Sequence, residues 1–244
     1  MQQADLLILA AGFGKRLGAL TENCPKALVK VAGKPLIFWN IELAVTAGFE
    51  KIFVNLHYLP ELIRKEVGDG SRWGIEIKYS EEQPLILDTG GAIKNIESKL
   101  EHQMLVTMNC DTLLGRDFSI SGLITRHQSC PEALATLVLR RDHRARDFGS
   151  VGVDTEGRVV SFLGKQYGKT PPIEELMYTG VQVLSRKLIA EMPPAGTVFS
   201  ITQDTYVEKL SAGGYINSDL YPGAWNDVGT PERLEEAQQQ ASKW

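Results

Sequence analysis

Short apolar runs alternate with amphipathic stretches through the first half of this chain. Apolar runs bounded by turn residues predict buried strands, and apolar residues at helical spacing predict helices that cover them. The pattern predicts strands at Leu6–Ala10, Lys51–Leu56, Ile75–Tyr79 and Met104–Met108, and helices at Leu36–Ala47, Pro60–Val67 and Gly91–Leu100. Strands that alternate with helices of this length pair in parallel through right-handed crossovers. We therefore expect a parallel sheet whose ligands bind at the carboxyl ends of its strands.

The second half changes character, because turns rather than helices join most of its apolar runs. The pattern there predicts strands at Leu134–Arg140, Val151–Asp154, Arg158–Leu163 and Met177–Leu184, and helices at Ser185–Glu191, Asp204–Ala212 and Pro231–Ala241. The sequence shows neither an internal repeat nor a long linker. We therefore expect residues 1–244 to form a single domain, with a smaller β-rich part in its second half.

Composition narrows the class of protein. A chain of 244 residues that is 43% hydrophobic can bury a sizeable core. The sequence has no apolar run of about 18 residues, as a membrane span would need, and its first residues lack a secretory signal pattern. Its 3 cysteines have no Cys-x-x-Cys spacing, and its net charge is −4. We therefore expect a cytoplasmic protein that has no membrane or nucleic-acid partner.

The loop after the first predicted strand carries the clearest chemical signal. Gly12 and Gly14 allow the backbone to approach a bulky anion closely, and Lys15, Arg16 and Lys26 bring positive charge to the same region. A glycine pair after a strand is often only a turn, but a single cation rarely neutralises a triphosphate, so the added cations matter. Strand, flexible turn and cations together predict a triphosphate-binding loop.

Further segments extend this signal along the chain. In order they are Leu9-Ala10-Ala11-Gly12-x-Gly14-x-Arg16-Leu17, Pro25-Lys26-Ala27-Leu28, Asp88-Thr89-Gly90-Gly91-Ala92, Asn109-Cys110-Asp111, Tyr178-Thr179-Gly180-Val181 and Trp225-Asn226-Asp227-Val228-Gly229-Thr230-Pro231. Together they resemble the sugar-1-phosphate nucleotidylyltransferases, enzymes that join a nucleoside triphosphate (NTP) to a sugar phosphate and release pyrophosphate. The resemblance covers essentially the whole chain.

The resemblance implies both a fold and a division of labour. The implied fold is α/β, with a Rossmann-like, mostly parallel mixed sheet flanked by helices, of the nucleotide-diphospho-sugar transferase type. Residues 1–130 would mainly bind the nucleotide. Residues 131–244 would mainly bind the sugar and would supply the second metal ligand.

The resemblance also assigns roles to particular residues. The implied Mg²⁺ ligands are Asp111 and Asp227, and the implied catalytic residues are Arg16, Lys26 and Asp111. The implied sugar-phosphate contacts are Lys165, Thr179 and Gly180, with Lys165 taken from a Gly-Lys-Gln triplet where the family often has Glu-Lys-Pro. The implied nucleotide contacts are Ala10, Ala11, Gly12, Gly14, Lys15, Arg16, Thr89, Gly90, Gly91 and Asn109.

The chemistry of nucleotidyl transfer favours a site that combines acidic metal ligands with basic residues. Nucleotidyl transfer brings two anions together, so catalysis depends on alignment and charge neutralisation more than on a protein nucleophile. Mg²⁺ suits two carboxylates combined with phosphate oxygens and water. We expect the loop amides with Lys15 and Arg16 to hold the β- and γ-phosphates. Lys26 would neutralise charge near the α-phosphate or the acceptor phosphate.

Several alternatives stay open at this point. The chain looks most like the compact N-acetylmuramate-1-phosphate uridylyltransferases, which implies UTP, whereas mannose- or heptose-1-phosphate guanylyltransferases would use GTP. From another class, a non-catalytic nucleotide-binding regulatory relative would typically have lost Lys26 or the metal carboxylates. The protein would be a monomer or homodimer. A basic run follows one strand and is either a solvated loop or a loop that closes over substrate; it comprises Arg140, Arg141, His143, Arg144 and Arg146.

Overall fold

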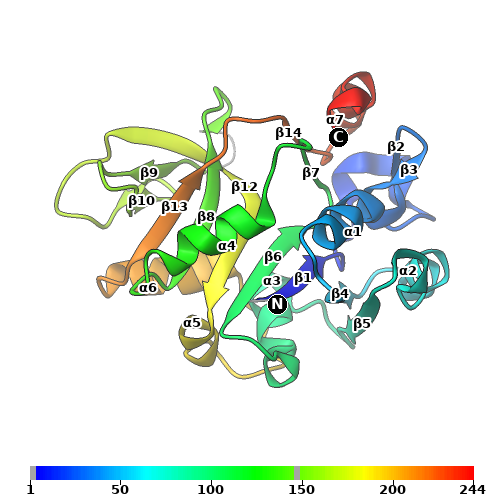
Figure 1. The fold of residues 1–244 in the computed structure, drawn as a ribbon, viewed down its shortest axis with the longest axis horizontal. Helices are drawn as coiled ribbons and strands as arrows, with labels where there is room; N and C mark the ends of the chain where they lie inside the picture. Colours follow the sequence, from blue (N-terminus) through cyan, green and yellow to red (C-terminus); the bar gives the residue numbers. More distant parts are fainter. Residues whose placement is uncertain (1–3, 146–148) are drawn as a thin grey trace. The chain divides into compact units, whose positions relative to one another are not determined.

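The computed structural model describes residues 4–145 and 149–244, and the chain forms two compact units (Figure 1). The first unit comprises the residues up to Ile86 together with Thr107–Ile120 and Gly223–Trp244. The second comprises Leu87–Val106 and Ser121–Pro222. The chain therefore leaves the first unit and returns to it twice. Within the described residues, none of the helices combines the length and the apolar character needed to cross a membrane.

Parallel strands form the sheet of the first unit. Strands β1 (Asp5–Leu9), β4 (Lys51–Leu56) and β5 (Glu76–Glu81) pair side by side in the order β1-β4-β5, all in parallel. Helices α1 (Leu36–Thr46) and α2 (Pro60–Val67) lie in the connections between them. The apolar runs of these strands are buried because helices cover parallel sheets. The expected parallel pairing is confirmed.

Local sequence explains where these helices begin and end. Helix α2 has Pro60 in its first turn, where the missing N–H costs nothing, and it ends at Gly68, whose φ of 71° is left-handed. The loop after β1 contains regular structure beyond what its glycines indicate, because Lys15–Thr21 (η1) forms 3₁₀ turns after left-handed Gly14, with a kink at Gly18, whose φ is 57°. A second 3₁₀ turn, η2, covers Lys26–Leu28.

The rest of the first unit consists of short elements. Strands β2 (Lys30–Val31) and β3 (Lys34–Pro35) form a hairpin, and β7 (Thr112–Leu114) pairs antiparallel with β14 (Trp225–Asp227) as a two-stranded ribbon. Helix α7 (Pro231–Gln239) and the 3₁₀ turn η7 (Ala241–Lys243) follow. Their shared core contains Leu17, Val29, Val31, Leu36, Leu113, Val228, Ala237 and Trp244.

Antiparallel pairing dominates the second unit. Its strands are β8 (Ala135–Arg140), β9 (Val151–Val153), β10 (Val159–Phe162), β11 (Lys165–Gln166), β12 (Glu174–Ser185) and β13 (Ile216–Leu220). The long strand β12 pairs with both β9 and β8, and only the β13–β8 pair is parallel among those described. Strand β6 (Met104–Asn109) begins in this unit and ends in the first.

Short helices complete the second unit. They are α3 (Asp88–Asn95) with the 3₁₀ turn η4 (Glu97–Lys99), then α4 (Ile120–Gln128), α5 (Arg186–Ala190) and α6 (Val207–Ser211). The helix predicted at Asp204–Ala212 is instead a π-helical segment, η6 (Ile201–Tyr206), followed directly by α6. The expected α/β class, with a mixed sheet flanked by helices, is confirmed. The assignment of residues 1–130 to nucleotide and 131–244 to sugar stays a prediction.

Candidate active site

The β7–β14 ribbon brings two acidic residues together from distant parts of the chain. Thr112 is the register partner of Asp227, and the Val228 N–H donates to the Asp111 carbonyl at 3.0 Å. Asp111 directly precedes β7, and Asp227 ends β14. Backbone hydrogen bonds therefore hold the two carboxylate-bearing residues at one end of the ribbon.

Lys26 reaches this acid pair from the second 3₁₀ turn. Its Nζ forms a short ion pair with Oδ2 of Asp111, and only 11% of the Lys26 side chain and 15% of the Asp111 side chain are exposed. Burial by itself lowers the pKa of Lys26, but the charge and hydrogen bond of Asp111 outweigh it and leave that pKa raised. The lysine is therefore charged at neutral pH.

The two carboxylate oxygens of Asp227 differ in their hydrogen bonding among the described residues. Arg233 donates from Nη1 to its Oδ2 at 2.9 Å, whereas its Oδ1 is buried with no hydrogen-bond partner among the described residues. Burial, followed by the nearby charge of Asp111, raises the pKa of Asp227 to about 6, against the opposing effect of Lys26, Arg233 and Arg16. An unpartnered buried carboxylate oxygen beside a second carboxylate fits a divalent-cation site.

The predicted phosphate loop adjoins the same cluster through Gly229. A Cβ on Gly229 would lie 3.0 Å from both Nη2 of Arg16 and Oδ1 of Asp227, so these groups approach each other across the glycine. Gly14 is left-handed, with a φ of 68°, and a Cβ there would meet Lys26 and Thr21. The structure thus brings together Arg16, Lys26, Asp111 and Asp227, while Gly12 and Lys15 are exposed nearby in the chain.

Buried amides behind the loop form a support that the sequence analysis missed. The Ala10 N–H donates to Oδ1 of Asn55 at 2.6 Å, and Nδ2 of Asn55 donates to Oε1 of the buried Glu82 at 2.7 Å. Asn40 similarly donates to the Cys110 carbonyl at 3.1 Å. The sequence signal that could have identified Asn55 and Asn40 is a polar residue within an otherwise apolar strand or helix. Because the Ala10 N–H already donates to Asn55, this amide has a hydrogen-bond partner within the protein.

The glycine pair at the start of α3 has a packing role in the second unit. The N–H groups of Gly90 and Gly91 both donate to the Phe199 carbonyl, at 3.0 and 3.2 Å, and a Cβ on Gly90 would clash with the Phe199 ring. Oγ1 of Thr89 accepts from the Ile201 N–H at 3.0 Å. These contacts explain the glycines without a ligand, and their nucleotide role stays a prediction.

The predicted sugar-phosphate contacts also lie in the second unit. Lys165 is exposed on β11, Thr179 is buried with its hydroxyl donating to the Val138 carbonyl at 2.9 Å, and Gly180 has a φ of 85°. Their roles likewise stay predictions. In the basic run, Arg141 pairs with Glu174 at 2.5 Å and Arg144 with Asp142 at 2.9 Å. Arg146 lies outside the described residues.

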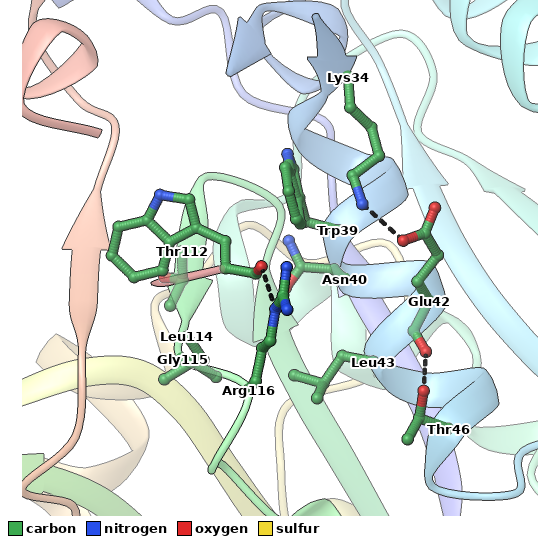
Figure 2. A pocket seen from close by; sticks show the side chains of 11 residues that line it. Lys34, Trp39, Asn40, Glu42, Leu43, Thr46, Thr112, Leu114, Gly115 and Arg116 are labelled. Carbon is green, nitrogen blue, oxygen red and sulfur yellow. Dashed lines mark hydrogen bonds and ion pairs between the residues drawn. The ribbon is translucent and has the colours of Figure 1, made fainter. Parts of the chain in front are cut away.

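A separate pocket of about 310 Å³ lies between α1 and β7 (Figure 2). Its cations are already engaged, because Lys34 pairs with Glu42 at 2.5 Å and Nε of Arg116 donates to the Trp244 carbonyl at 2.7 Å. None of the predicted site residues lines it, although Asn40 and Thr112 do. The pocket therefore borders the strand that carries the site without containing the acid pair.

We expect Gly229→Ala to lower turnover about 10-fold, because the new methyl group would push Arg16 and Asp227 apart by a few tenths of an ångström. The melting temperature should change little if the exposed Arg16 side chain makes most of the adjustment and the largely buried Asp227 stays in place. Steady-state kinetics and thermal melting of the purified variant would check both. Unchanged turnover would show that this close approach is irrelevant to the chemistry.

If Asp111 and Asp227 hold Mg²⁺, we expect Mg²⁺ to stabilise the protein and this effect to fade below about pH 6, because a proton then competes with the metal for the raised-pKa carboxyl of Asp227. The folded-state pKa exceeds the unfolded value, so without metal this group makes folding more favourable as pH falls from about 6 to about 4. Melting temperatures with and without Mg²⁺ at about pH 7.5 and about pH 5.5 provide the measurement. An equal Mg²⁺ effect at both values would contradict the expectation.

Comparisons with known proteins agree on the class of enzyme, a nucleotidyltransferase. A family model described as nucleotidyl transferase matches residues 6–243. Mannose-1-phosphate guanylyltransferase of Mycobacterium tuberculosis is 35% identical over 94% of this chain, which spans only 62% of that protein. N-acetylmuramate alpha-1-phosphate uridylyltransferase of Neisseria meningitidis serogroup B is 32% identical over 98% of both chains. D-glycero-alpha-D-manno-heptose 1-phosphate guanylyltransferase of Aneurinibacillus thermoaerophilus is 31% identical over 97% of both.

Solved structures are similar over nearly the whole chain. HddC from Yersinia pseudotuberculosis, complexed with GMP-PN, has a TM-score of 0.79 and 25% identity over 98% of this chain and 100% of its own. A Bacillus anthracis protein in complex with a sucrose has a TM-score of 0.82 at 20% identity, over 99% of this chain and 96% of its own. The second likeness concerns the fold alone.

Proposed function

Because this chain belongs to the nucleotidyl transferase family, we propose that it makes an NDP-sugar and pyrophosphate from an NTP and a sugar 1-phosphate. Relatives that match it along their whole length are sugar-1-phosphate uridylyl- and guanylyltransferases, which confirms the class of enzyme expected from the sequence. The observation that carries the proposal is the grouping of Lys26 and Arg16 with Asp111 and Asp227. The chemistry needs both signs of charge at one place.

Each residue of the cluster has a part in the proposed mechanism. Asp111 and Asp227 would hold Mg²⁺, which when bound supplies positive charge for the α-phosphate and the incoming sugar phosphate. Lys26, beside Asp111, would neutralise the α-phosphate or the acceptor phosphate. Arg16 and Lys15, with the loop amides, would hold the β- and γ-phosphates and stabilise the departing pyrophosphate. The sugar-phosphate oxygen attacks the α-phosphorus in line, so no protein nucleophile is required.

For the substrates, we propose UTP and an N-acetylmuramate-1-phosphate-like sugar. The neisserial uridylyltransferase supports this choice, because it matches this chain over 98% of both lengths. GTP with a mannose or heptose 1-phosphate is the second candidate, and the mycobacterial and Aneurinibacillus relatives favour it. A non-catalytic nucleotide-binding relative is disfavoured because Lys26, Asp111 and Asp227 are all present and adjacent. We further propose a cytoplasmic monomer or homodimer.

The test is a matrix of substrates assayed for product. The four common NTPs are each combined with N-acetylmuramate, mannose and heptose 1-phosphates in the presence of Mg²⁺, and pyrophosphate and the NDP-sugar are measured. A thermal-shift screen of the same NTPs reports binding separately, because a ligand of the native state raises the melting temperature. Formation of one NDP-sugar with equimolar pyrophosphate supports the proposal. NTP binding without product from any pair would favour the non-catalytic alternative.

A further inference from the structure

A side chain of helix α7, that of Arg233, contacts Asp227 of the acid pair. Arg233 lies in the first half of this helix, and its Nη1 donates both to Oδ2 of Asp227 at 2.9 Å and to the carbonyl of Asp227 at 3.3 Å. The two side chains are 11% and 15% exposed. One guanidinium nitrogen thus contacts both the main chain and the side chain of the same residue, which restricts the rotation of the carboxylate.

We propose that Arg233 is a positioning residue: it holds Oδ2 of Asp227 so that the buried Oδ1 is the oxygen presented to the divalent cation. This inference rests on the proposed function, because that function assigns the cation to Asp111 and Asp227. Oδ1 is the oxygen without a partner among the described residues, and it is also the oxygen that approaches the Arg16 side of Gly229.

Arg233 is itself held from several sides. Its N–H donates to the hydroxyl of the helix-capping Thr230 at 3.4 Å, and its guanidinium lies 5.9 Å from the centre of the Trp225 ring. Trp225 belongs to β14, in register with Leu114 of β7. The Arg233 backbone is therefore anchored at the start of α7, and its guanidinium lies near both the Trp225 ring and Asp227, so Arg233 connects α7 to the ribbon that carries both acids.

The helix has a second, independent attachment that does not involve the acids. Gln238, five residues further along α7, accepts from the Ala32 N–H at 2.8 Å and donates to the Lys30 carbonyl at 2.9 Å, so it contacts the β2–β3 hairpin (Figure 1). Loss of Gln238 would loosen the docking of α7 without touching Asp227. This residue therefore offers a matched control for the orientation of the carboxylate.

Charge and geometry act in opposite directions at Arg233. A guanidinium next to a metal ligand repels a divalent cation, so charge alone would make the site weaker. Fixing the carboxylate has the opposite effect, and removal of partners that orient metal ligands typically costs about 10–100-fold in metal affinity. Arg233→Lys keeps the charge but shortens the side chain and replaces the guanidinium whose Nη1 contacts both the carbonyl and Oδ2 of Asp227, so it isolates the geometric contribution.

The experiment measures Mn²⁺ binding by the full chain without substrates, from the electron paramagnetic resonance signal of free Mn²⁺. We expect Arg233→Lys to weaken Mn²⁺ binding about 10-fold, Gln238→Ala to leave it unchanged, and Arg233→Gln to weaken it despite the lost positive charge. Thermal melting without metal identifies a variant that fails to fold. If one Arg233 variant fails to fold, Mn²⁺ binding by the other Arg233 variant tests the proposal. In turnover, Arg233→Lys should raise the Mg²⁺ concentration for half-maximal rate while leaving the rate at saturating Mg²⁺ near normal.

Other results would overturn the inference. Binding as tight in both Arg233 variants as in the wild type would exclude a positioning role, and an equal loss in Gln238→Ala would assign the effect to helix docking. Absence of any Mn²⁺ binding by the wild type would also exclude it. The proposed function fails separately, through absence of NDP-sugar from the substrate matrix, because the Mn²⁺ titration requires no turnover.

Discussion

Asp111→Asn and Asp227→Asn should each lower the rate of NDP-sugar formation on the order of 10² or more, with the fold intact. Each substitution keeps the size of the side chain but removes a negative charge that the proposed Mg²⁺ site requires. Backbone hydrogen bonds of the β7–β14 ribbon hold both positions, and an amide does not disturb them, although Asp111→Asn also removes the partner of Lys26 and should therefore cost some stability. Pyrophosphate release at saturating substrates and circular dichroism together provide the measurement.

Glu235→Gln is the matched control for these two variants. Glu235 is exposed on α7, so the same change from carboxylate to amide should leave turnover unchanged there. The two aspartate variants should also lose the stabilisation of the protein by Mg²⁺, which distinguishes a missing ligand from a general decline. Near-normal turnover in both would mean that the acid pair does not hold the catalytic metal.

Lys26→Met should have the second largest effect, lowering both activity and stability. The substitution leaves Asp111 buried without its cationic partner, and breaking a buried ion pair on one side costs about 3–5 kcal/mol. It also removes the charge proposed to face the α-phosphate or the acceptor phosphate, so we expect turnover to fall on the order of 10²-fold or more. Urea denaturation and steady-state kinetics measure the two losses independently.

A double-mutant cycle with Asp111→Asn separates these contributions. In the Asp111→Asn background, Lys26→Met should cost much less stability, because no unpaired carboxylate remains next to it. Its effect on turnover at any residual activity would then report on phosphate neutralisation alone. If the stability cost were the same in both backgrounds, the Lys26–Asp111 pair would not be the interaction that holds this side chain.

Periodicity predicted most of the regular elements, and explicit end signals fixed some of them to the residue. Strand β4 and helix α2 match their predicted bounds, Lys51–Leu56 and Pro60–Val67. For the helix, a proline at its start and a glycine just after its end explain the match. The elements that periodicity did not predict are short or contain polar residues. Strands β7 and β14 have only three residues each, and β13 contains Asn, Ser and Asp, so their pairing depends on distant partners that periodicity does not report.

The site shows the same division between local and long-range information. The family resemblance led to Lys26, Asp111 and Asp227, and the family itself is confirmed. Arg233 gave no signal, because a single arginine on an exposed helical pattern is ordinary until the fold places it next to Asp227. The reverse holds for Gly90 and Gly91, whose contact with Phe199 supplies a packing reason for residues that the resemblance assigns to nucleotide.

The β7–β14 ribbon has a consequence for how proteins of this architecture can diverge. The second unit is inserted between the two ribbon strands along the chain, apart from its Leu87–Val106 segment. The separation of Asp111 from Asp227 is fixed by main-chain pairing, so it does not depend on the length or sequence of the segment between them. If the second unit binds the sugar and the acid pair holds the metal, as proposed above, loops between the ribbon strands can be lengthened, shortened or exchanged to accept a different sugar while Asp111 and Asp227 keep their spacing.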